Sequence, residues 1–192
     1  MSADISFHYE LNFCIACVAE LRDYLFSEKL YWPLQSKAFP SKPNYPMMTI
    51  GAVLLAMKQA RTLATTMSHY GELDRVEENL ATLQKEWGGV WKIKAKEEFN
   101  ARLRRWGQYL TDLRRSEEDY FPNYRYEVRW RVILDLLSTN FDNLSIADQN
   151  ILGEFDQQLL EKFISGEFIW EYGLSIGFPR ERYWYLWGNL LT

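Results

Sequence analysis

Apolar residues recur at steps of three and four along most of the chain, which is the period of one face of an α-helix. On this pattern we expect helices over residues 10–30, 49–70, 72–115, 125–139 and 145–164. Thr49 and Ser145 stand where two of them begin, and a hydroxyl there can accept a hydrogen bond from a backbone N–H of the first turn. Residues 168–170 are the one candidate strand. The pattern therefore predicts an all-α fold, an elongated helical bundle of five or six helices.

The segment 72–115 has the longest regular spacing, with apolar positions from Leu73 to Leu113 in near-heptad steps. Gly88 and Gly89 interrupt it and together cost roughly 2 kcal/mol of helix propensity relative to alanine. The segment is therefore either one long central helix, straight or kinked, or an antiparallel helical hairpin. We favour the single helix slightly.

The last part of the chain, residues 167–192, is rich in aromatic side chains and interrupted by glycine and proline. Its aromatic residues are Phe168, Trp170, Tyr172, Phe178, Tyr183, Trp184, Tyr185 and Trp187. We expect a loop and a short helix over about 179–187, which together form an aromatic C-terminal cap. Rings at this density must cover either the bundle or a partner, because each gains roughly 1.5–3 kcal/mol on burial. We expect Trp170 and Trp187 to be structural, and Trp184 or Tyr185 to be partly exposed and partner-binding.

A length of 192 residues predicts a single helical domain over 1–192, with the proline-rich segment 33–48 as a tethering loop. No apolar run approaches the roughly 20 residues that a membrane span needs. No basic region precedes an apolar stretch near the start, so we expect no signal peptide. These features predict a cytoplasmic protein without a membrane partner.

Cys14 and Cys17 are the two cysteines, and with His8 and His69 they are the soft metal ligands of the chain. Cysteines three apart on a helix share a face and could meet one zinc ion, but we expect both to be small buried core residues. We expect no metal and no cofactor. The sequence also lacks a Glu-x-x-His pair, a phosphate-binding glycine loop and a Gly-x-Ser-x-Gly elbow, so we expect no enzyme.

The net charge is −4, but the stretch 85–131 has 12 basic and 8 acidic residues. Basic side chains interleave with aromatic ones there, a combination that suits phosphates and unpaired bases. The candidate nucleic-acid-binding residues are Lys92, Lys94, Lys96, Arg104, Arg105, Arg114 and Arg115. Arg125, Arg129 and Arg131 extend this stripe if their helix packs alongside. The alternative is an ordinary solvated helix face.

The sequence leaves three functions open. The leading hypothesis is a non-catalytic adaptor or subunit that binds a protein partner in a larger cytoplasmic assembly, because aromatic residues are enriched where proteins meet. The second is an accessory subunit of a nucleoprotein complex that contacts the nucleic-acid backbone through the 92–131 stripe. An enzyme without a recognisable motif is the third.

Overall fold

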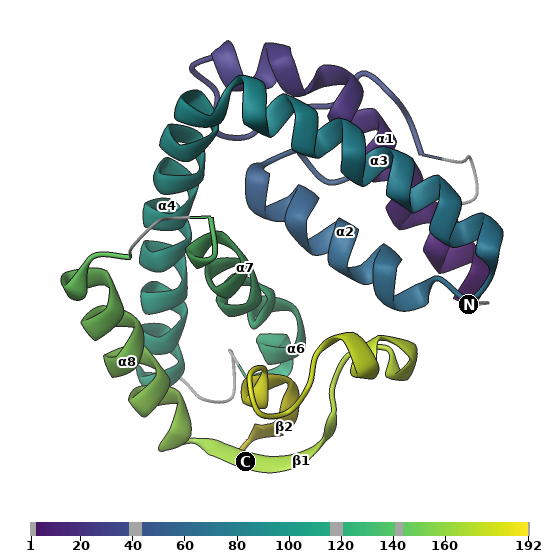
Figure 1. The fold of residues 1–192 in the computed structure, drawn as a ribbon. Helices are drawn as coiled ribbons and strands as arrows, with labels where there is room; N and C mark the ends of the chain where they lie inside the picture. Colours follow the sequence, from purple (N-terminus) through teal and green to yellow (C-terminus); the bar gives the residue numbers. More distant parts are fainter. Residues whose placement is uncertain (1–2, 39–43, 116–120, 141–143, 192) are drawn as a thin grey trace. The chain divides into compact units, whose positions relative to one another are not determined.

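The computed structural model describes residues 3–38, 44–115, 121–140 and 144–191, and most of them are helical, as the sequence predicts (Figure 1). The chain divides into two compact units, residues 1–98 and 99–192. Unit 1 contains α1 (Ala3–Phe26), α2 (Ile50–Leu63), α3 (Met67–Glu86) and the first part of α4 (Gly88–Arg115). Helix α1 packs against both α2 and α3. Compared with the expected range 10–30, α1 begins and ends earlier in the chain.

The expected helix 49–70 is two helices, α2 and the beginning of α3, and the break lies before residue 70 rather than at Gly71, where the notable glycine of this region stands. Thr49 caps α2 as expected, since its hydroxyl accepts from the N–H of Ala52. The backbone becomes extended at Ala64, and Thr66 then caps α3 by accepting from the N–H of His69. Gly71 lies inside α3. The N-cap at Thr66, and not Gly71, therefore sets the boundary between α2 and α3.

The segment 72–115 is neither one continuous helix nor an antiparallel hairpin. Trp87 leaves helical geometry (φ −118°, ψ 33°), and the chain changes direction there between α3 and α4 (Figure 1). Its N–H donates to the carbonyl of Leu83 at 2.9 Å, and its carbonyl accepts from Trp91 at 2.9 Å. The hydrogen-bond ladders of both helices thus meet at one residue, directly before the predicted weak point at Gly88 and Gly89.

Unit 2 contains the rest of α4 and two further groups of elements. The first group is η1 (Phe121–Asn123), α6 (Tyr124–Glu127), α7 (Arg129–Ser138) and α8 (Ile146–Leu160). The second is β1 (Phe163–Phe168), η2 (Tyr172–Gly177), η3 (Trp184–Leu186) and β2 (Trp187–Leu190). Ser145 caps α8 as expected by accepting from the N–H of Asp148 at 3.1 Å. Helices α4 and α8 approach closely at Gly107, where a Cβ would lie 2.5 Å from the ring of Phe155.

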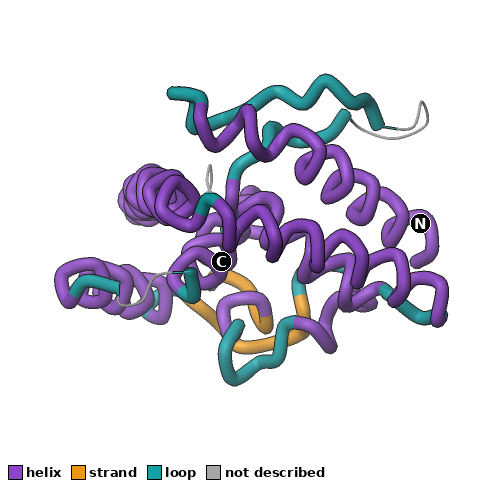
Figure 2. The backbone as a smooth tube through the Cα atoms, turned by 45° about the horizontal axis from the view of Figure 1, so that its top comes forward, coloured by secondary structure: helices purple, strands orange, loops and turns teal. Residues whose placement is uncertain are grey.

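The strands β1 and β2 correct two predictions, a helix continuing to residue 164 and a short helix over 179–187. They form an antiparallel ribbon, drawn in orange in Figure 2, in which Phe163 lies opposite Leu190 and Phe168 opposite Trp187. The 179–187 region has turns and the 3-10 helix η3 instead of an α-helix. Pairing between segments far apart in the chain decides this structure, and local periodicity does not report such pairing.

Two buried charged side chains on the first part of α4 hold the ends of two other helices. Lys94 donates from Nζ to the carbonyl oxygens of Ser27 and Lys29, at 2.7 and 2.9 Å, just beyond the C-terminal end of α1. Glu98 accepts from the N–H of Gly51 at 2.7 Å, in the first turn of α2. Each charge has the sign that the helix end favours. Because residues four apart lie on one helix face, a single turn of α4 stabilises both ends.

We expect Lys94→Met to lower the free energy of unfolding by about 2–3 kcal/mol, because two carbonyls lose charge-assisted hydrogen bonds in a buried place. Urea titration followed by circular dichroism measures the change. Lys85→Met is the control, since Lys85 is exposed in the last turn of α3. Equal midpoints for the two variants would show that Lys94 does not stabilise the end of α1.

Gly188→Ala is expected to disrupt the ribbon at a cost of about 2–3 kcal/mol. Gly188 has φ +154°, and a Cβ there would overlap the carbonyl oxygen of Ile164 and the ring of Phe163. Gly166→Ala is the matched control, since its Cβ would meet the Cα of Gly188 at an ordinary 3.7 Å. Thermal unfolding should separate the two variants, and a similar loss in both would contradict the assignment.

Candidate functional site

The two aromatic residues predicted to bind a partner differ in their exposure to solvent. Tyr185 is fully buried, so its prediction as an exposed contact is wrong. Its carbonyl accepts from the hydroxyl of Tyr124 at 2.6 Å, and the guanidinium of Arg131 lies 4.8 Å from its ring centre. Trp184 is half-buried and packs edge-on against Phe163 at 5.3 Å. Of this pair, Trp184 alone has an accessible ring.

The other predicted anchors are engaged within unit 2. The indole N–H of Trp170 donates to the carbonyl of Arg125 at 3.0 Å, and that of Trp187 donates to the carbonyl of Phe178 at 2.8 Å. Both rings are half-buried. The aromatic segment therefore contributes its rings mainly to its own fold.

A different set of apolar side chains is exposed in unit 2. Tyr172 and Ile176, both on η2, are 81% and 84% exposed. Ile164 and Leu191 are also exposed, and the register of β1 and β2 makes them diagonal neighbours on one face of the ribbon. We refer to these four residues, two on η2 and two on the ribbon, together as the C-terminal apolar surface. The spacing of aromatic residues does not indicate these four positions, although Gly173 and Gly177 mark this segment as irregular.

One member of the predicted basic stripe is buried inside unit 1. Lys94 is buried in its role at the end of α1, so its prediction as a nucleic-acid contact is wrong. Lys92 and Lys96 belong to unit 1, whereas the four predicted arginines belong to unit 2. Arg114 pairs with Glu161 at 3.2 Å. Exposed arginines remain at positions 104, 105 and 115.

Part of the stripe is concentrated around one tryptophan. The guanidinium carbons of Arg102, Arg105 and Arg129 lie 4.3, 5.5 and 5.2 Å from the ring centre of Trp130. Arg102 and Arg105 are three apart on α4 and therefore share a face, and α7 brings Trp130 against that face. We name these four residues the arginine–tryptophan cluster. Guanidinium groups stack favourably on an indole ring, and stacking leaves their N–H donors available.

The cluster concentrates positive charge. Burial, together with the charge of Arg102, lowers the pKa of Arg129 from its ordinary value. Glu127 is the nearby carboxylate, and it accepts the indole N–H of Trp130. In the described part of the chain, Arg105 and Arg129 form no ion pair or hydrogen bond. Arg131 does not join them, because it pairs with Asp156 through two bonds of 2.7 and 2.8 Å.

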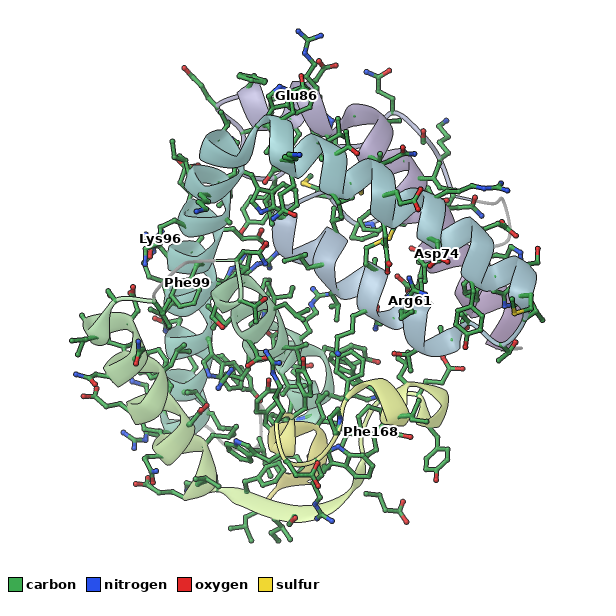
Figure 3. The ribbon with its side chains drawn as sticks, viewed as in Figure 1. Arg61, Asp74, Glu86, Lys96, Phe99 and Phe168 are labelled. Atoms are coloured by element: carbon green, nitrogen blue, oxygen red, sulfur yellow. The ribbon has the colours of Figure 1, made fainter. Side chains whose placement is uncertain are left out.

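Titratable groups also gather in unit 1. Arg61 on α2 faces Asp74 on α3 at 2.8 Å and also pairs with Glu77 (Figure 3). The two cysteines of unit 1, Cys14 and Cys17, are buried. Burial raises the pKa of each thiol, and the charge of Glu10 raises that of Cys14 further. Such thiols stay protonated and are poor nucleophiles. Among the described residues, no three of histidine, cysteine, aspartate and glutamate are grouped to hold a metal ion.

Across those same residues, no helix is both long and apolar enough to cross a bilayer. Compared with known protein families, with curated proteins and with solved structures, the chain matches none.

Glu10 on α1 makes the stability of the protein depend on pH. Burial raises its pKa from 4.5 to about 7, so between these values the folded chain retains a proton that the unfolded chain releases. The contribution of Glu10 to stability is therefore full below about pH 4.5, falls as the pH rises, and is lost above about pH 7.

We expect Glu10→Gln to flatten this dependence and to raise the free energy of unfolding at pH 8 by about 2–3 kcal/mol, since one pKa unit corresponds to about 1.4 kcal/mol. Urea titrations at pH 4.5 and pH 8 measure both effects. The exposed Glu78, replaced by glutamine, is the control. If the two variants respond to pH alike, Glu10 is not the group responsible.

Proposed function

We propose that this protein is a non-catalytic adaptor or subunit that docks a protein partner through the C-terminal apolar surface. The observation that carries the proposal is the exposure of Tyr172 and Ile176, each above 80%, within a segment whose other rings are mostly packed. A large ring on a short 3-10 helix loses little conformational freedom when it binds, and tyrosine is enriched in protein interfaces.

The ribbon carries the other two exposed residues of this group. Ile164 and Leu191 present aliphatic groups on the face opposite Phe163 and Leu190. The strands also keep their outer backbone edges unpaired within the described sheet. A partner strand could satisfy those N–H and C=O groups while its side chains cover the aliphatic ones.

A nucleoprotein subunit is the second candidate function, and the arginine–tryptophan cluster favours it. The support is narrower than the sequence suggests, because it comes from three arginines around one ring rather than from a stripe along 92–131. The two functions use different residues, so one protein can carry both.

The test of protein docking replaces the two most exposed residues of the surface together, Tyr172→Ser and Ile176→Ser. The tagged protein is purified from its native host, and co-purifying proteins are quantified against wild type. We expect a stoichiometric partner to be lost by at least tenfold, with thermal unfolding unchanged because neither side chain is buried.

The matched control replaces two exposed apolar residues of unit 1, Met67→Ser and Ile93→Ser. It removes a similar exposed area and should retain the partner. If both double variants retain every stoichiometric partner, or if the wild type has none, the docking proposal fails.

A further inference from the structure

The geometry points to a binding site for single-stranded nucleic acid at the arginine–tryptophan cluster, extended by Tyr126. We infer that Arg105 and Arg129 hold backbone phosphates and that the ring of Tyr126 stacks on an unpaired base. The inference rests on the second candidate function and names its ligand. It does not depend on the C-terminal apolar surface.

The phosphate contacts follow from the arrangement of the two exposed arginines. Arg105 and Arg129 come from different helices, α4 and α7, and both lie within 6 Å of the Trp130 ring centre. An arginine fork has five N–H donors, and neither group spends them on an ion pair or hydrogen bond among the described residues. Trp130 is itself held by its bond to Glu127, so the platform under the arginines is ordered before a ligand arrives.

The closely spaced positive charges of the cluster favour the binding of an anion. Burial and the neighbouring Arg102 lower the pKa of Arg129, so the cluster holds positive charges that repel one another. A phosphate bound by Arg129 offsets the repulsion between Arg129 and Arg102 and gains charge-assisted hydrogen bonds.

Tyr126 supplies the feature that favours a single strand over a duplex. It is 67% exposed on α6. Val128, between α6 and α7, keeps helical dihedral angles (φ −59°, ψ −19°), and its carbonyl accepts from Val132. Tyr126 therefore shares a face with Arg129 and Trp130, three and four positions later. An exposed ring beside phosphate-binding arginines can stack on a base, and a base is free to do so when it is unpaired.

The test measures binding of fluorescently labelled 12-nucleotide RNA and DNA single strands by anisotropy across a range of salt concentrations. Arg105→Gln with Arg129→Gln should weaken binding at least tenfold and reduce the slope of log affinity against log salt by about 1.4, since each phosphate contact contributes about 0.7. The control is Arg22→Gln with Arg75→Gln, which makes the same charge change at two exposed positions of unit 1. It should leave the slope nearly unchanged.

Stacking is tested separately. Tyr126→Ala should weaken single-strand binding by about tenfold, the effect of losing one stacked base. Tyr172→Ala should leave it unchanged, although that variant belongs to the surface proposed for protein docking. A failure of nucleic-acid binding is thus distinguishable from a failure of docking.

Three results would overturn the inference. The first is no binding of either single strand by wild type at low salt. The second is equal loss in the two double arginine variants, which would show general charge rather than a site. The third is equal or tighter binding of a duplex or of polyglutamate, which would remove the role of the unpaired base.

Discussion

The first unit depends on two opposite charges placed one turn apart on α4. Lys94 binds carbonyl groups just beyond the C-terminal end of α1, and Glu98 binds an N–H group in the first turn of α2. One turn of α4 therefore contacts the ends of two helices that are separate in the sequence. Both side chains are almost fully buried. A buried charge is costly unless hydrogen-bonded, so this arrangement requires the helix ends to stay where they are. The termination of α1 and the start of α2 are thereby coupled through α4.

The sequence allows helices to be predicted wherever periodicity and capping are both local. The start of α8 at Ser145 and the helical stretch around α7 follow from residues within a few turns of each other. The strands could not be predicted in the same way. Phe163 and Ile164 continue the helical spacing of α8, but their backbone partners lie near the end of the chain. Long-range pairing overrides the local pattern there.

The candidate sites show the same division. From the sequence, Arg129 is expected near the basic residues of α4 only if its helix packs alongside. The contact between Trp130 and Arg102 shows that α7 packs against α4. Lys94 continues the three-four spacing of Trp87 and Val90, which indicates an inward position, but its partners at the end of α1 are distant residues that local spacing does not reveal. Tyr185 likewise contacts residues distant in sequence, since the guanidinium of Arg131 lies 4.8 Å from its ring centre and its carbonyl accepts from Tyr124. The sequence thus predicts residue type and helix face, but it does not predict contacts between residues that are distant in the chain.

The close approach of α4 and α8 has a consequence for how this protein can change over evolutionary time. Any side chain at position 107 would enter the space that the ring of Phe155 occupies. A relative with alanine or serine at 107 should therefore carry a smaller residue at 155, so these two positions should covary as a pair. An adjacent exposed position such as Gln108 is free of that restriction toward Phe155. In a set of diverged sequences, joint substitution at positions 107 and 155 would indicate that α4 and α8 are in contact there.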